Sequence, residues 1–256
     1  MPPIIELRRS EIGEVKVIMF DVDGVTVPRG TKIRYKNDDL YLHIKKCPKS
    51  IIKGLKQLSK HFHINISSGR SLLYLLEMYQ EILDVANLSF TVENGHYTYF
   101  NNTGEIIQHY KVRITERQLL NKIRKNIEKR GEIEPKEMFL TLHTPKRLHG
   151  LQTYDLQYLY NGEAYDIGYI DKGHPVSWFK NHFGKVLAIG DNYNDKEMLE
   201  NADISVTVDK SRVAGMFYID YEQENMFINI LPAEILINHL LKLRREMYGS
   251  KILSEV

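Results

Sequence analysis

The stretch VKVIMFDVDGVTVPRG, residues 15–30, decides the fold class. Its first part, VKVIMF, is a short apolar run typical of a strand that is buried on both faces of a sheet. Directly after this run come Asp21 and Asp23, one residue apart, and then a glycine. A turn that ends the strand explains a lone D-x-D-G equally well. The two aspartates therefore indicate a site only if other polar residues gather at the same edge.

Short apolar runs of this kind recur along the chain, bounded by polar residues or glycine. The predicted strands are 15–20, 61–67, 88–92, 185–190, 203–208 and 216–219. Stretches with the periodicity of an amphipathic helix lie at 50–60, 71–83 and 232–247. Strands that alternate with helices predict an α/β fold, with a Rossmann-like, doubly wound parallel sheet as its core.

The middle of the chain has a different pattern. A helical stretch at 114–131 is followed by strand-like runs at 137–144, 151–160 and 163–170. Asn161-Gly162 is a strong hairpin signal between the last two runs, and their alternation of apolar and polar residues predicts a sheet with one wet face. We therefore predict a small α+β cap domain inserted in the core. The predicted boundaries are 112–168 for the cap, and 1–111 with 169–256 for the core.

Charge and cysteine content restrict the class of protein. With 35 basic and 33 acidic residues, a net charge of +2 gives no electrostatic reason to expect nucleic acid or a membrane as partner. The single cysteine, Cys47, excludes an internal disulfide and a cysteine-rich metal site. Residues 1–14 lack the apolar stretch of a signal peptide. We expect a cytoplasmic protein, and the sequence leaves open whether it is a monomer or a homodimer.

Polar residues follow two further predicted strands. In a doubly wound sheet, ligands bind beyond the carboxyl ends of the strands. The tripeptide SGR at 68–70 follows one strand, GDNYND at 190–195 ends another, and Lys172 begins a helical segment ahead of it. Each feature has a structural explanation on its own, as a helix cap, a turn glycine or a solvated lysine. Their common position at one sheet edge makes a site the better explanation.

The acidic residues at this edge point to a cation. Carboxylates brought close together repel one another strongly unless a positive charge lies among them. A hard divalent cation with oxygen ligands, most plausibly Mg²⁺, relieves that repulsion. The lysine and the serine hydroxyl then make sense as groups that hold a phosphate. No Walker A pattern or G-x-G-x-x-G fingerprint is present, which argues against a nucleotide or dinucleotide cofactor.

The order D-x-D-G, S-G-R, lysine and G-D-x-x-N-D resembles the four motifs of the haloacid dehalogenase superfamily. Within it, the chain is similar to the type IIB branch of sugar and small-molecule phosphatases, which includes Cof-like proteins and archaeal phosphoglycolate phosphatases. That branch places its α/β cap between the second and third motifs, where 112–168 lies. The segment 92–107, VENGHYTYFNNTGEII, also resembles the turn and hairpin that lead toward the cap in this branch.

The resemblance implies a role for each motif residue. Asp21 is the expected nucleophile, which forms an aspartyl-phosphate, and Asp23 the expected general acid and base. Mg²⁺ is expected to bind the Asp21 carboxylate, the Asp23 backbone carbonyl and Asp191, with Asp195 as a direct or indirect partner. The residues expected to bind the phosphoryl group are Ser68, Gly69, Arg70, Lys172 and Asn194.

Two motif positions depart from the pattern of the superfamily. Val25-Thr26 replaces the usual Thr-Leu after the glycine of D-x-D-G, at a supporting turn and not at a catalytic group. Ser68 stands where the branch more often has threonine, and it keeps the hydroxyl. Neither departure removes a group on which the expected chemistry depends.

The leading hypothesis is a Mg²⁺-dependent phosphatase that hydrolyses phosphoglycolate or a sugar phosphate. A phosphomannomutase-like phosphotransferase and a non-catalytic protein that binds a phosphorylated ligand are the alternatives. Several polar residues of the cap are candidates for substrate specificity, although a polar outer face on a small sheet is the simpler explanation for each. These candidates are His143, Lys146, Arg147, His149, Tyr154 and Tyr165.

Overall fold

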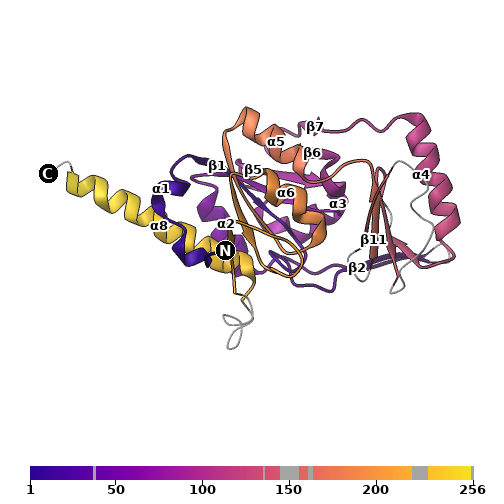
Figure 1. The fold of residues 1–256 in the computed structure, drawn as a ribbon, viewed down its shortest axis with the longest axis horizontal. Helices are drawn as coiled ribbons and strands as arrows, with labels where there is room; N and C mark the ends of the chain where they lie inside the picture. Colours follow the sequence, from indigo (N-terminus) through magenta and orange to yellow (C-terminus); the bar gives the residue numbers. More distant parts are fainter. Residues whose placement is uncertain (37–38, 135, 145–155, 161–163, 221–229, 255–256) are drawn as a thin grey trace.

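The computed structural model describes residues 1–36, 39–134, 136–144, 156–160, 164–220 and 230–254. Two sheets organise the molecule, and they lie side by side along its long axis (Figure 1). The larger is an eight-stranded core sheet, and the smaller is a six-stranded cap sheet. No helix in the described part of the chain is both long and apolar enough to span a membrane.

The core sheet has the strand order β14-β13-β12-β1-β4-β5-β6-β7. Its central strand, β1 (Val15–Phe20), pairs in parallel with β12 (Lys185–Gly190) and with β4 (His63–Ser67). Phe20 lies opposite Ile189 on one side and Ile66 on the other, so the three strands end level. This register brings the three predicted motif segments to one edge. The remaining strands are β5 (Leu88–Val92), β6 (Tyr97–Phe100), β7 (Ile106–Gln108), β13 (Ile204–Thr207) and β14 (Phe217–Tyr218).

Helices cover both faces of the core sheet, as a doubly wound fold requires. Alternate residues of β1 point to opposite sides: Ile18 and Phe20 enter one apolar core, and Val17 and Met19 enter the other. The first core also takes residues from α2 (Lys49–Leu58), α3 (Leu72–Met78) and α8 (Pro232–Ser254). The second takes residues from α5 (Gly173–His182) and α6 (Lys196–Asn201). The predicted fold class is confirmed.

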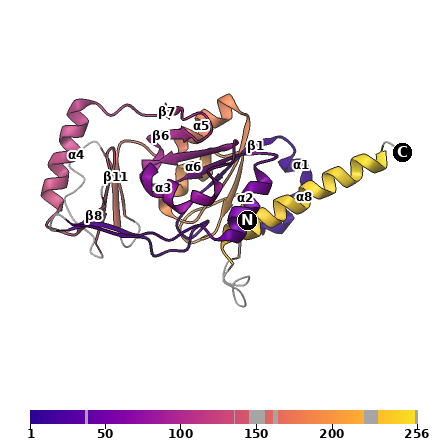
Figure 2. The ribbon, with the colours of Figure 1, turned by 180° about the vertical axis from the view of Figure 1, so that it is seen from behind.

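The N-terminal segment packs on the core. It contains a 3-10 helix (Ile4–Glu6) and the short α1 (Arg9–Ile12), which lies beside α8 (Figure 2). Ile4, Leu7 and Ile12 are buried in the first apolar core. This segment therefore belongs to the core and adds to its apolar interior.

The cap sheet has the strand order β10-β11-β9-β8-β2-β3, with antiparallel neighbours. On one face lies α4 (Ile114–Ile127), whose Leu120, Ile123 and Ile127 pack against strand residues. The strands are β2 (Lys32–Lys36), β3 (Asp39–His43), β8 (Glu132–Glu134), β9 (Leu140–His143), β10 (Gln157–Tyr160) and β11 (Ala164–Gly168).

The cap sheet differs from the prediction in its membership. The hairpin β2–β3 lies in the segment assigned to the core, yet β2 pairs with β8 through Tyr35 and Ile133. The predicted cap, 112–168, thus lacks two strands of this sheet. The reason is that 32–43 is rich in charge and the alternation of charged and apolar residues in KIRYK, at 32–36, spans only five positions. The Asn161-Gly162 turn lies outside the described residues, whereas the two strands that it was expected to join do pair in antiparallel register.

Several element boundaries also differ. The helix predicted over 71–83 ends at Met78, and a 3-10 helix (Gln80–Ile82) follows it. The helix predicted over 114–131 ends at Ile127, and the next residues enter the unpredicted strand β8. The hairpin expected within 92–107 is present as β6 and β7, which extend the core sheet in antiparallel register.

Candidate active site

The turn after β1 is built around Gly24. Its φ of +90° is a conformation that favours glycine, and a Cβ there would lie 2.7 Å from the Asp191 carboxylate. The Gly24 amide donates to the Val27 carbonyl at 2.8 Å. Thr26, at the position that departs from the superfamily pattern, donates its hydroxyl to the Asp21 carbonyl at 2.8 Å. Thr26 thus supports the turn that follows Asp21.

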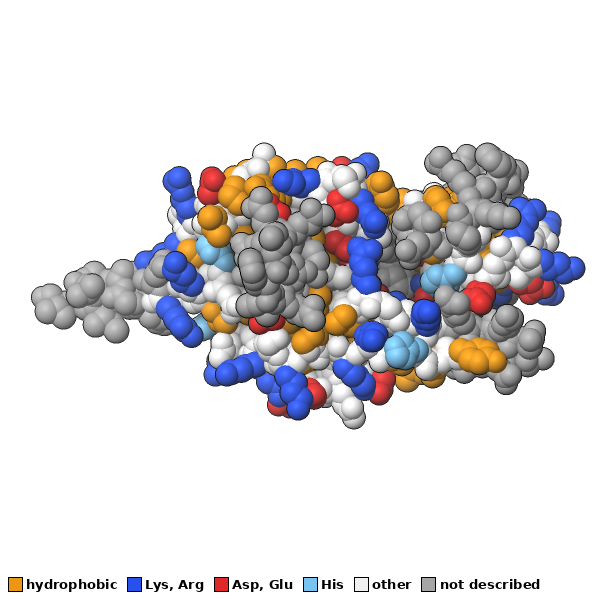
Figure 3. Space-filling view, turned by 90° about the horizontal axis from the view of Figure 1, so that it is seen from below, with side chains coloured by type: hydrophobic (Ala, Val, Ile, Leu, Met, Phe, Trp, Pro, Cys, Tyr) orange, Lys and Arg blue, Asp and Glu red, His pale blue; other side chains and the backbone are white. Residues whose placement is uncertain are grey.

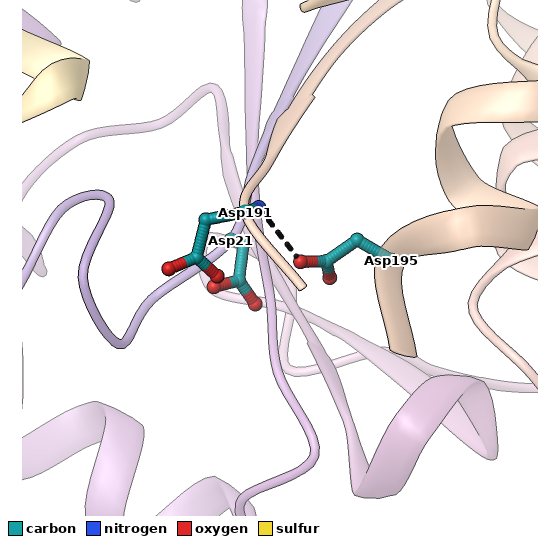
Figure 4. A group of neighbouring side chains, drawn as sticks. All are labelled: Asp21, Asp191 and Asp195. Carbon is teal, nitrogen blue, oxygen red and sulfur yellow. Dashed lines mark hydrogen bonds between the residues drawn. The ribbon is translucent and has the colours of Figure 1, made fainter. Parts of the chain in front are cut away.

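A buried cluster of carboxylates lies at the ends of β1 and β12. One carboxylate oxygen from each of Asp21, Asp191 and Asp195 lies within 4.8 Å of the others (Figure 4). Lys172, at the start of α5, is fully buried beside them. Its Nζ donates to Asp21 Oδ1 and to Asp195 Oδ1, both at 2.6 Å. The sheet edge therefore gathers three acidic groups around one lysine.

Asp195 is held in place by the turn that precedes it. Its Oδ2 accepts hydrogen bonds from the Asp191 amide at 3.0 Å, drawn in Figure 4, and from the Asn192 amide at 3.1 Å. Its Oδ1 accepts from Lys172. Because both oxygens have donors from this chain, Asp195 orients the loop and the lysine.

Negative charge exceeds positive charge in this cluster. Burial, reinforced by Asp195, raises the pKa of Asp191 to about 6. Burial and Asp195 also hold the pKa of Asp21 well above its ordinary value, although Lys172 opposes the shift. Burial disfavours the Lys172 ammonium, but Asp195 and Asp21 outweigh it and raise the Lys172 pKa, so this lysine stays charged. A set of buried carboxylates that outnumbers its neighbouring cations and offers only oxygen ligands fits a divalent cation such as Mg²⁺.

Arginines contact two of the motif aspartates that line the cavity. Arg29 forms an ion pair with Asp191. Arg70 holds the Asp23 carboxylate through two hydrogen bonds, of 2.7 Å from Nε and 2.9 Å from Nη2. Its other terminal nitrogen lies 3.5 Å from Glu134 of β8. Arg70 therefore links the side chain of Asp23 to the cap.

A cavity of about 530 Å³ separates the carboxylate cluster from the cap sheet. Figure 3 shows basic side chains along the junction between the two bodies. From the core, the lining residues include Asp21, Asp23, Ser68, Gly69, Arg70, Asp191 and Asn194. From the cap, they include Glu134, Lys136, Thr141, His143 and Asp166. The cavity thus brings the motif residues face to face with a polar cap wall.

Lys172 and Arg70 differ in position from the other predicted phosphate-binding residues. Ser68, Gly69 and Asn194 line the cavity. Lys172 is fully buried and lies behind the carboxylates, on Asp21 and Asp195. Arg70 reaches the cavity but holds Asp23.

The residues of the cap that were predicted as candidates for substrate specificity also differ in position. His143 lines the cavity, whereas Tyr165 is buried in the apolar core beneath α4 and stacks on Tyr160. Tyr165 therefore belongs to the cap interior. The other four candidates, Lys146, Arg147, His149 and Tyr154, lie outside the described residues.

The cap wall holds a second cluster of buried charges, which sequence reasoning missed. Lys136 donates to Thr141 Oγ1 at 2.5 Å, and Thr141 donates to Asp166 at 2.7 Å. Burial alone would raise the pKa of Glu134, but Lys136, His143 and Arg70 lower it to about 2. Glu134 is therefore ionised at neutral pH and at mildly acidic pH. A local signal existed in EIEPKEM (132–138), where three charged residues alternate with apolar ones.

Glu93 joins the core to the cap. Glu93 and Asn94 both have positive φ, at 47° and 60°, in the turn after β5. The Glu93 carboxylate is buried and accepts the backbone amides of Glu137 at 3.1 Å and Met138 at 2.6 Å. The Asn94 amide donates to the Ser68 carbonyl at 3.1 Å. One strained turn thus contacts both the loop that holds Ser68 and the cap.

Comparison with known proteins supports the resemblance. Residues 170–214 match the family model of haloacid dehalogenase-like hydrolases. The fold is similar to the C-terminal domain of a C. albicans trehalose-6-phosphate phosphatase, with a TM-score of 0.66 and 15% identity over 94% of this chain and 97% of that one. It is also similar to an Aspergillus fumigatus trehalose-6-phosphate phosphatase, with a TM-score of 0.58 and 17% identity over 96% and 99%.

A third solved structure gives the same result. A haloacid dehalogenase-like hydrolase from Bacteroides thetaiotaomicron has a TM-score of 0.54 and 11% identity, over 80% of this chain and 94% of that one. The sequence matches none of the curated proteins. At these identities the likeness to solved structures establishes the fold, and the motif segment 170–214 adds the family match.

Proposed function

Because the chain has the haloacid dehalogenase fold and matches the hydrolase family model over 170–214, we propose that it is a Mg²⁺-dependent phosphatase. It hydrolyses a small phosphorylated metabolite through an aspartyl-phosphate on Asp21. One observation carries the proposal: Asp21, Asp191 and Asp195 cluster around Lys172 at the floor of a cavity that Asp23 and Ser68 also line. This arrangement supplies a nucleophile, a proton carrier and oxygen ligands in one place.

Asp21 performs the first displacement. Lys172 holds its Oδ1 at 2.6 Å, which fixes the direction of the carboxylate. A carboxylate oxygen of Asp21 attacks phosphorus, and the bond between phosphorus and the ester oxygen breaks. The leaving oxygen takes a proton from Asp23. In the structure Asp23 is paired with Arg70, so this pair must part before Asp23 can carry that proton.

Water completes the reaction. Asp23, now a carboxylate, accepts a proton from a water molecule that attacks phosphorus. The bond between phosphorus and the Asp21 oxygen breaks, inorganic phosphate leaves, and Asp23 is again protonated. Ser68 and the Gly69 amide lie at the cavity wall, where they donate hydrogen bonds to the phosphoryl oxygens. When bound by Asp21 and Asp191, with Asp195 beside them, Mg²⁺ offsets the negative charge of the transferring group.

A sugar or polyol phosphate fits the cap wall better than phosphoglycolate does. Glu134 is ionised, and Asp166 lines the same wall. Carboxylates accept hydrogen bonds from hydroxyl groups, whereas they repel the carboxylate of a glycolate leaving group. Lys136 is already engaged with Thr141 and lies 3.7 Å from Glu134. The charges on this wall therefore favour a leaving group that carries hydroxyls.

Phosphate release tests the proposal. The assay compares glucose 6-phosphate, phosphoglycolate and an aryl phosphate, with Mg²⁺ and with EDTA. The variants are Asp21→Asn and the control Asp84→Asn, an exposed carboxylate whose partner is Lys56. We expect Mg²⁺-dependent release that Asp21→Asn abolishes and Asp84→Asn preserves. Transfer of phosphate to an added sugar hydroxyl in place of water would favour the phosphotransferase. Saturable binding of these compounds with no turnover would favour the binding protein.

A further inference from the structure

We propose that Arg29 takes the place of the divalent cation in the metal-free protein, and that metal binding displaces its guanidinium from Asp191. This inference rests on the proposed function because it assumes that the carboxylate cluster binds Mg²⁺. It adds a residue outside the four motifs that sets the affinity of the metal site.

The position of Arg29 is set by the catalytic turn. Arg29 lies between that turn and β2, and it pairs with Asp191 Oδ2. A Cβ on Gly24 would lie 2.7 Å from Arg29 Nε and 2.7 Å from Asp191 Oδ2. The guanidinium and the carboxylate therefore meet directly over the glycine, in space that only the missing side chain leaves open. A glycine is therefore favoured at position 24 for two reasons: its positive φ, and the space that the contact between Arg29 and Asp191 needs.

The charges of the cluster explain why Arg29 is drawn there. Lys172 donates to Asp21 and Asp195. Asp191 is the third carboxylate of the cluster, and Arg29 forms an ion pair with it. Without a metal, the guanidinium supplies positive charge that the buried carboxylates otherwise lack. Arg29 thus stabilises the metal-free site.

The same contact makes Arg29 replaceable. The side chain of Arg29 is 54% exposed, whereas that of Asp191 is 5% exposed and that of Lys172 is fully buried. An arginine that reaches in from solvent regains water when it leaves, so an ion pair of this kind is weak. A divalent ion on the same carboxylate carries twice the charge and repels the guanidinium at short range. Metal binding therefore removes Arg29, while Lys172 remains.

Magnesium affinity tests this competition. Isothermal titration calorimetry with MgCl₂ would compare the full-length wild type with Arg29→Gln and with the control Arg212→Gln. Arg212 lines the same cavity but pairs with Asp209, 3.1 Å away. We expect Arg29→Gln to bind Mg²⁺ about fivefold more tightly, the size of a typical exposed ion pair. Arg212→Gln is expected to change the affinity less than twofold. Unchanged or weaker binding by Arg29→Gln would overturn the proposal.

A second measurement avoids reliance on that variant's folding. The ¹⁵Nε resonance of Arg29 in the wild type, assigned by its loss in Arg29→Lys, should shift when Mg²⁺ is added. A resonance that stays fixed while the protein binds Mg²⁺ would show that Arg29 keeps its partner, and the proposal would fail. If the wild type binds no Mg²⁺ at all, the metal dependence in the proposed function fails, and this inference fails with it. If the protein binds Mg²⁺ but Arg29 is not displaced, only this inference fails and the proposed function stands.

Discussion

The two walls of the cavity both bury carboxylates, but the pKa shifts of those carboxylates have opposite signs. On the core wall, Asp21, Asp191 and Asp195 lie close together, Lys172 contacts the first and last of them, and the pKa values of Asp21 and Asp191 are raised. On the cap wall, Glu134 lies among Lys136, His143 and Arg70, and its pKa falls to about 2. Burial thus accompanies a raised carboxylate pKa on one wall and a lowered one on the other. The proposed metal site lies on the wall where carboxylates outnumber the cations beside them, because a cation from outside would supply the missing positive charge.

The largest expected effect is on turnover by Asp21→Asn. Loss of the nucleophile should lower kcat by about a thousandfold or more. The same change removes one of the repelling carboxylates, so the melting temperature in EDTA should rise. Glu134→Gln, its counterpart on the cap wall, should lower the melting temperature because it removes an acid whose charged form is stabilised. A fall in melting temperature for Asp21→Asn would contradict the proposed charge imbalance.

The next effect concerns the two buried lysines. Lys172→Met leaves the core carboxylates without their buried cation, and we expect a loss of about 3–5 kcal/mol in unfolding free energy. Lys136→Met is the matched change on the cap wall, where Glu134 keeps Arg70 and His143. Its loss should be smaller. Urea unfolding of both variants in EDTA would measure the difference, and equal losses would show that the two walls are balanced alike.

The pH dependence of stability should have opposite signs on the two walls. The pKa of Asp191 in the folded protein is about 6, above its ordinary value of 3.8, so the fold favours the protonated acid. Its ionisation lowers the stability of the metal-free protein as pH rises from about 4 to about 6. The pKa of Glu134 in the folded protein is about 2, below its ordinary value of 4.5. Its stabilising effect is present above pH 4.5 and is lost as pH falls toward 2.

The difference in melting temperature between a variant and the wild type, followed over pH, isolates the contribution of each residue from that of the other titrating groups. Melting temperatures in EDTA should rise in Asp191→Asn relative to the wild type, and the gap should widen between pH 4 and 6. The gap between the wild type and Glu134→Gln should narrow as pH falls below 4.5. Saturating Mg²⁺ should stabilise the wild type more at pH 7 than at pH 5. A pH-independent gap for Asp191→Asn would mean that this carboxylate is already neutralised.

The smallest expected effect is at Glu93, where the two walls are joined. Glu93→Gln weakens the contacts to the amides of Glu137 and Met138, at a cost of about 1 kcal/mol. Hydrogen exchange at those two amides should become faster, and KM should rise more than kcat falls. The control is Glu81→Gln, an exposed residue of a 3-10 helix in the core. Unchanged exchange at 137–138 would mean that other contacts hold the cap segment.

The sequence predicted the core wall better than the cap wall for a physical reason. Parallel strands that alternate with helices must end at one edge, so each motif could be placed from its own strand. The buried contact of Lys172 with Asp21 and Asp195 depends on side-chain packing, which the motif order does not specify. The cap sheet depends on the pairing of β2 with β8, about a hundred residues apart. Contacts between residues far apart in the sequence also explain why no local pattern pointed to Arg29, Glu93, Glu134 or Lys136.

The split origin of the cap sheet affects how this protein can be recombined. Strands β2 and β3 follow the turn after β1, whereas β8 to β11 come from a segment much later in the chain. Excising 112–168 as one cassette would leave the β2–β3 hairpin without its neighbour β8. A graft of another cap onto this core must therefore exchange two separate segments together. Deletions and domain swaps that remove or replace only one of these two segments should yield insoluble chains. Exchanges that replace both segments together should yield folded chimaeras.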